Sequence, residues 1–226
     1  MLFDLLRGGD KLDIIIGLAA SVFVVFCTLP IHEYAHAFVA TKLGDPTPER
    51  TGRLTLNPMA HIDPMGALMI ILVGFGYAKP VRVSARNFKN PKAGMAITAL
   101  AGPLSNIIMA FLFILLRNCA TVALINTGAL VWEVSASFFT FAASINISLA
   151  VFNLLPIPPL DGSKILSIII PSKYYFKYLQ YERYIILAVF ALIVFGILDT
   201  PLAFATEKVF GILAKIAYLP FKAMGY

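Results

Sequence analysis

Long apolar runs separated by shorter polar stretches make up most of the chain. A helix needs about 20 apolar residues to cross a bilayer, whereas a run of 10–14 is more typical of a re-entrant, interfacial or buried segment. Runs of spanning length, the fourth counted with an aromatic extension at 181–184, cover residues 14–40, 93–116, 131–155 and 185–198. Residues 202–219 carry three charged side chains and either span or lie along the interface. The pattern predicts an all-α polytopic membrane protein with about five to six hydrophobic helices.

The apolar run at residues 66–78 is only 13 residues long and is bounded by Pro64 and Pro80. Its length predicts a short re-entrant segment that enters the membrane and returns on the same side. Residues 81–85 then alternate between apolar and polar, and this period of two predicts a small β element between the first and second core helices. Such an edge strand would pair with an extended substrate peptide, and the alternative is an ordinary loop.

The composition is that of a chain embedded in a bilayer, with 59% hydrophobic and 13% charged residues and a mean hydropathy of +0.84. This excess excludes intrinsic disorder, and two cysteines exclude a disulfide scaffold. The first apolar run is expected to be retained, because no small-residue cleavage pattern of a signal peptide follows it. We therefore expect one integral membrane domain over residues 1–226, with a core at 14–162 and C-terminal helices at 181–220.

The net charge of +6 arises from Lys and Arg residues in loops beside the apolar runs. This placement sets membrane orientation and argues against a nucleic-acid partner. If residues 66–78 do not cross, the loops that follow the first and third spanning runs share one side, and most of the basic residues lie there. The positive-inside rule makes that side cytoplasmic, and we expect the protein to lie in the plasma membrane.

The first spanning run contains the sequence His32-Glu33-Tyr34-Ala35-His36, which is an H-E-x-x-H motif. Two histidines four residues apart lie on one helix face and can bind one metal ion, and zinc is the expected ion because it accepts neutral imidazole. Glu33 flanks this face and is the expected general base, which takes a proton from zinc-bound water. The alternative is a pair of hydrogen-bonded core histidines, although ionisable groups in an apolar helix usually mark function.

A catalytic zinc ion needs a third protein ligand, and the candidates are Asp161, His61 and Asp63. Asp161 follows a proline-rich segment that cannot form a regular helix, and Gly162 permits close approach of the backbone. Asp161 lies on the same side of the membrane as His32 and His36 only if residues 66–78 do not cross. The distribution of basic residues independently favours that topology, so we favour Asp161 as the third ligand. The alternative for His61 and Asp63 is a loop-capping role.

Three motifs in order resemble the site-2 protease family of intramembrane zinc metallopeptidases, in its short branch without a PDZ or CBS domain. They are His32-Glu33-x-x-His36, Gly102-Pro-Leu-Ser-Asn106, and Asn153 followed eight residues later by Asp161-Gly162. The resemblance implies one Zn²⁺ ion held by His32, His36 and Asp161, with Glu33 activating water and Asn106 and Asn153 lining the site. Residues 76–83 look like a family loop that usually has proline where Arg82 stands.

The expected activity is that of a zinc endopeptidase that cuts a transmembrane segment of another protein near the cytoplasmic interface. Asn153 or Asn106 would stabilise the developing oxyanion. The alternative for these residues, and for Asn146, is hydrogen bonding between helices. Residues 185–198 and 202–219 are candidates for a lateral gate. The expected partners are a transmembrane protein substrate and the lipid bilayer, with a regulatory membrane partner and the oligomeric state left open. A membrane transporter and a non-catalytic scaffold with a buried metal site are the alternative functions.

Overall fold

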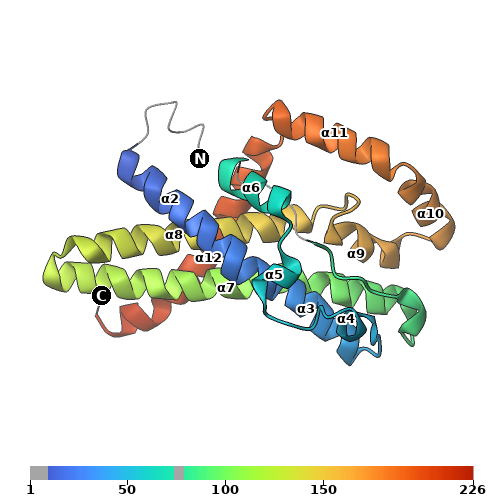
Figure 1. The fold of residues 1–226 in the computed structure, drawn as a ribbon. Coiled ribbons are helices and arrows are strands. Elements are labelled where there is room, and N and C mark those ends of the chain that lie inside the picture. Colours follow the sequence, from blue (N-terminus) through green and yellow to red (C-terminus); the bar gives the residue numbers. More distant parts are fainter. Residues whose placement is uncertain (1–9, 74–78, 226) are drawn as a thin grey trace.

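The structure is a computed structural model that describes residues 10–73 and 79–225, and these residues form helices and loops with no strand among them. Figure 1 shows their arrangement. In chain order the α-helices are α2 (Lys11–Phe23), α3 (Leu29–Lys42), α4 (Thr47–Arg50), α5 (Pro58–His61), α6 (Pro64–Val73), α7 (Pro91–Thr127), α8 (Leu130–Asn153), α9 (Asp161–Ile169), α10 (Ser172–Gln180), α11 (Glu182–Val194) and α12 (Asp199–Ala223). The predicted all-α class is confirmed for these residues.

The first apolar run forms one continuous helix from Lys11 to Lys42, in agreement with the predicted span at 14–40. A short π-helical segment, η1 (Val24–Thr28), joins α2 to α3. Because the hydrogen-bond pattern changes at this segment, Pro30 falls in the first turn of α3, where a missing N–H is tolerated. The helix therefore continues through the proline and into the H-E-x-x-H motif.

Within residues 10–73 and 79–225, three helices are long and apolar enough to cross a membrane, namely Lys11–Lys42, α7 and α8. α7 runs well beyond the predicted end at residue 116 and stops at Gly128, whose positive φ of 63° ends the helix. The extension is stabilised where the buried Asn118 side chain donates to the Ala217 carbonyl of α12 at 3.2 Å. Helices also form at the C-terminal runs, as α11 and α12. The count of about five to six hydrophobic helices in the membrane stays a prediction.

The core lies where α2 crosses the antiparallel pair α7 and α8, which Figure 1 shows side by side. Buried alanines at the contacts let the helix backbones approach closely. Aromatic rings fill the centre of this core. The ring centroid of Phe113 lies 5.8 Å from that of Phe23 and 6.4 Å from that of Phe139. This rigid assembly holds α3 against the first half of α7, where the functional residues lie.

The predicted β element at residues 81–85 is wrong. Residues 81–84 have neither helical nor strand structure, and Ala85–Asn87 form one turn of 3₁₀-helix, η2. A ladder needs a neighbouring strand, and none is present among the described residues. The amide groups of Val81 and Ser84 instead donate to the side chains of Glu33 and Asp45. The alternation of apolar and polar residues predicts an extended backbone, but it does not show whether a second strand is there to pair with it.

The prediction of a re-entrant segment falls partly outside the described residues. Its first part, Pro64–Val73, is the helix α6, while residues 74–78 lie outside the described range. The re-entrant path therefore stays a prediction.

Candidate active site

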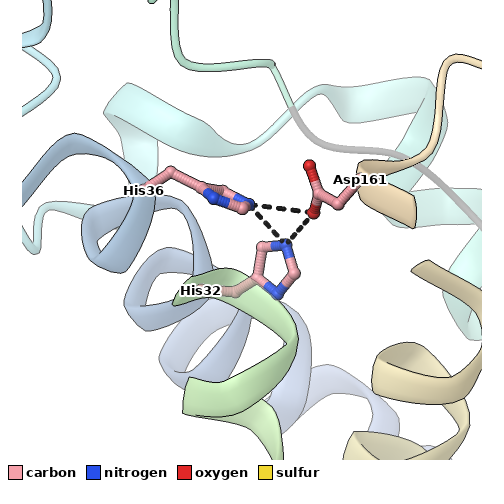
Figure 2. A group of neighbouring side chains, drawn as sticks. All are labelled: His32, His36 and Asp161. Atoms are coloured by element: carbon pink, nitrogen blue, oxygen red, sulfur yellow. Dashed lines mark hydrogen bonds and ion pairs between the residues drawn. The ribbon is translucent and has the colours of Figure 1, made fainter. Parts of the chain in front are cut away.

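The motif histidines and Asp161 meet in the structure, as Figure 2 shows. His32 and His36 are buried, and one helical turn of α3 separates them, which places their Nε2 atoms 3.1 Å apart. Asp161 is the first residue of α9, and its Oδ2 atom lies 3.4 Å from Nε2 of His32 and 3.0 Å from Nε2 of His36. Three potential ligand atoms from distant parts of the chain therefore surround one point.

This triangle fits a zinc ion. Ligand atoms about 2.0–2.1 Å from a tetrahedral zinc stand about 3.3 Å from one another, which is close to the three separations observed. Two imidazoles with one carboxylate form a common donor set of catalytic zinc sites. A tetrahedral ion held by three protein ligands keeps its fourth position open, as a hydrolytic site requires.

The first half of α7 orients His36. The Nδ1 atom of His36 lies 2.7 Å from the Thr98 carbonyl oxygen, so Nδ1 carries the proton and donates it. Nε2 is then left with a lone pair that faces His32 and Asp161. Such a hydrogen bond behind a ligating histidine fixes both tautomer and ring orientation.

Gly102 of α7 makes room for the histidines. A Cβ atom at this position would overlap the rings of both His36 and His32. The glycine of the G-x-x-x-N motif is therefore required by close approach to these two side chains. Asn106, one turn further along α7, is buried and has no hydrogen-bond partner among the described residues.

The loop between α8 and α9 places Asp161 beside the two histidines. Gly162 packs against this loop, because a Cβ atom there would overlap the carbonyl oxygens of Leu154 and Leu155. The Asp161 side chain is 8% exposed, and the ammonium nitrogen of Lys164 lies 3.1 Å from its Oδ1 atom. The positive charge of Lys164 beside Oδ1 favours the ionised form of this buried carboxylate over the neutral form. The carboxylate is ionised, which is the form that binds metal.

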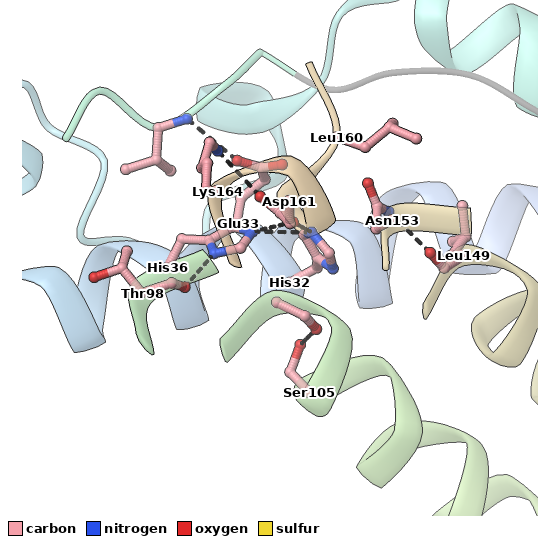
Figure 3. Close-up of polar contacts among 12 residues, drawn as sticks. His32, Glu33, His36, Thr98, Ser105, Leu149, Asn153, Leu160, Asp161 and Lys164 are labelled. Carbon is pink, nitrogen blue, oxygen red and sulfur yellow. Dashed lines mark hydrogen bonds and ion pairs between the residues drawn. The ribbon is translucent and has the colours of Figure 1, made fainter. Parts of the chain in front are cut away.

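A cavity of about 430 Å³ opens beside this cluster. Glu33, Asn153 and Lys164 line it together with the two histidines and Asp161, as Figure 3 shows for their side chains. The Glu33 carboxylate accepts a hydrogen bond from the Val81 amide at 3.3 Å. The Asn153 amide donates to the Leu149 carbonyl oxygen of its own helix at 2.9 Å. Asn106 is not among the residues that line the cavity.

The other two candidates for the third ligand have structural roles at the end of α5 and the start of α6. A ring nitrogen of His61, Nε2, lies 2.7 Å from the Thr55 carbonyl oxygen. The Asp63 carboxylate accepts from the amides of Met65 and Gly66 and so caps α6. The loop-capping interpretation is thus confirmed for Asp63. Asn146 donates within its own helix, to the Ala142 carbonyl oxygen, and not between helices.

Another buried carboxylate, Asp45, which sequence reasoning missed, holds the cavity wall in place. Asp45 follows α3. Its Oδ1 atom accepts hydrogen bonds from Thr47 and from the Asn87 side chain, and its Oδ2 atom accepts one from the Ser84 amide. Burial alone would raise the pKa of Asp45, but these hydrogen bonds lower it. Asp45 thereby ties the segment that carries Val81 and Val83 to the end of the histidine helix.

Comparison with known proteins agrees with this geometry. The sequence profile described as "Peptidase family M50" matches residues 117–196, which include Asp161. The "Putative zinc metalloprotease YwhC" of Bacillus subtilis is 40% identical over 169 residues, which are 72% of this chain and 74% of that protein. The chain belongs to peptidase family M50, the site-2 proteases. It is a membrane metallopeptidase of the site-2 protease type, and its cofactor is zinc.

Two further relatives are less similar in sequence. The "Putative zinc metalloprotease Rip2" of Mycolicibacterium smegmatis is 31% identical over 144 residues, and these cover 60% of this chain and 51% of that protein. The "Putative zinc metalloprotease MJ0611" of Methanocaldococcus jannaschii is 32% identical over 136 residues, or 60% of this chain and 62% of that protein. The chain thus spans about half to three-fifths of these two relatives. No solved structure matches this M50 chain.

Proposed function

We propose that this protein is an intramembrane zinc endopeptidase that hydrolyses a peptide bond within or near a transmembrane segment of another membrane protein. The observation that carries the proposal is the meeting of His32, His36 and Asp161 beside a cavity that Glu33 also lines. The histidines and Glu33 lie on a helix that is long and apolar enough to span a membrane. A substrate that reaches this cavity from the bilayer is itself a membrane segment.

In this proposal His32, His36 and Asp161 hold one zinc ion, with His36 oriented by Thr98. When bound, zinc acts as a Lewis acid on the peptide carbonyl and makes water easier to deprotonate. Glu33 accepts the proton of the attacking water and passes it to the leaving amine nitrogen. The hydrogen bond from the Val81 amide keeps the Glu33 carboxylate in place at the cavity wall.

The asparagines take different parts in this proposal. Asn153 lines the cavity, so its side-chain amide can turn from the Leu149 carbonyl oxygen toward a substrate carbonyl and stabilise the oxyanion. Asn106 is buried on the same α7 face as Gly102, one turn away, and does not line the cavity, so in this proposal it does not contact the substrate.

The proposed location is the plasma membrane, with the active site toward the cytoplasm. Lys42, Arg50 and Lys92 lie in or beside the polar segments that adjoin the site end of α3 and α7, which supports this orientation. A regulatory membrane partner is compatible with this arrangement. The orientation can be tested with the variant Arg50→Cys, made in a chain that also carries Cys27→Ser and Cys119→Ser. The new thiol should react with an impermeant maleimide only from the cytoplasmic side. Labelling only from outside would contradict the orientation.

The substitution Glu33→Gln tests the proposed activity. The full chain is reconstituted in liposomes with single-span membrane proteins as trial substrates, and cleavage and bound zinc are measured together. We expect cleavage by the original chain and a loss of about 10²–10⁴-fold in the variant, because general-base catalysis is removed. Zinc should stay at one ion per chain in both. Loss of ion flux without proteolysis would instead indicate a transporter, and indifference to the substitution would indicate a scaffold.

A further inference from the structure

The two oxygens of the Asp161 carboxylate face different partners, as Figure 3 shows. Oδ2 points to the histidine pair, whereas Oδ1 lies 3.1 Å from the ammonium group of Lys164. Lys164 is three residues further along α9 and also lines the cavity. Among the described residues, Asp161 is the ion-pair partner of this lysine.

The position of Lys164 is not explained by the stability of its helix. It lies in the first turn and a half of α9, where the helix dipole disfavours a positive charge. Its side chain is 39% exposed, but the carboxylate that its ammonium group contacts is only 8% exposed. The position of Lys164 is explained if its ammonium group acts on the Asp161 carboxylate that it contacts.

A carboxylate can bind a metal ion through one oxygen or through both. Binding through both would use the position that a hydrolytic zinc site must keep open. We propose that Lys164 is a positioning residue that holds Oδ1 of Asp161 and so limits this ligand to coordination through Oδ2. This inference rests on the proposed role of Asp161 as a zinc ligand.

The test uses cobalt, because the visible absorption of Co²⁺ reports the number of its ligands. The full chain and the variants Lys164→Met, Lys164→Arg and Lys92→Met are purified in detergent, stripped of metal and titrated with Co²⁺ alone. Lys92 is a matched control, since its ammonium group donates to the Ile170 carbonyl at the other end of α9 and does not touch Asp161. Size-exclusion profiles show whether each variant is folded.

We expect one Co²⁺ ion and strong four-coordinate bands for the original chain, Lys164→Arg and Lys92→Met. Lys164→Met should still bind one ion, but its bands should weaken about twofold or more, because a higher coordination number lowers their intensity. An unchanged spectrum in Lys164→Met would overturn the proposal. Loss of Co²⁺ binding in that variant alone would also overturn it, since the lysine would then govern affinity. If the original chain binds no Co²⁺, the proposed metal site itself fails.

Discussion

The two halves of the metal cluster are positioned by different kinds of structure. The histidines lie on the continuous helix Lys11–Lys42, where helical spacing alone brings His32 and His36 together. Asp161 instead follows a proline-rich loop and depends on contact between Gly162 and the carbonyl groups at the end of α8. On the histidine side the tight neighbours are side-chain rings, which can move slightly. On the aspartate side they are backbone atoms, which cannot move alone, so the aspartate side should be the more sensitive.

The largest effect is expected from Gly162→Ala. The added Cβ atom would overlap the carbonyl oxygens of Leu154 and Leu155 and displace Asp161 from the histidines. Zinc affinity should fall by about 100-fold, as for other changes that misplace a ligand. Competition with a fluorescent zinc chelator measures this affinity. Gly211→Ala is the control, because a Cβ atom at position 211 meets nothing within 4 Å, and its affinity should not change.

A smaller effect is expected from Gly102→Ala. Here the Cβ atom would overlap the rings of His32 and His36, which can rotate partly away at a cost typical of overpacking, about 1–3 kcal/mol. Zinc affinity should fall by about tenfold in the same competition assay. A greater loss in Gly102→Ala than in Gly162→Ala would reverse the comparison between the two halves.

The smallest effect is expected from Asp45→Asn, which tests the cavity wall and not the ligands. Asparagine keeps one oxygen for Thr47 and Asn87 but presents an amino group to the Ser84 amide, so one hydrogen bond is lost. The free energy of unfolding should fall by about 1–3 kcal/mol at neutral pH, while bound zinc stays at one ion. Asn90→Ala, which removes a cap of α7 without touching this wall, is the control for a general loss of stability.

The effect of Asp45→Asn should also depend on pH. Because folding lowers the pKa of Asp45, its ionised form stabilises the protein at neutral pH. This stabilisation is lost as the pH falls below about 4, the ordinary value, toward the lowered one. Thermal unfolding followed between pH 7 and pH 3 should therefore show the two proteins converging in acid. A constant difference across this range would contradict the assignment.

The sequence predicted the helical half of the site well because its geometry is local. His32 and His36 come together whenever their segment is helical. The length of the apolar run around them predicts that helix. The meeting with Asp161 was reached through the membrane-crossing argument, which gives the side of the membrane but not the contact. The loop-capping alternative for Asp63 was also available from the sequence, and the structure shows its side chain capping α6.

The parts that sequence reasoning missed depend on contacts between distant segments. Asp45 and Ser84 are 39 residues apart, and nothing in either neighbourhood indicates that they meet. The strand predicted at residues 81–85 failed for the same reason, since a period of two says nothing about a pairing partner. The predicted helix ended with the apolar run at residue 116, but α7 continues to Thr127, and α12 gives its Asn118 side chain a buried partner.

The most direct test of the central claim is the zinc content of four purified single variants beside the original chain. The account predicts one zinc ion per chain in the original and in His61→Ala and Asp63→Ala, whose residues have loop roles. It predicts a loss of at least about tenfold in retained zinc for His36→Ala and Asp161→Ala, because each removes one of three ligands. Full zinc in Asp161→Ala together with loss in His61→Ala or Asp63→Ala would contradict it.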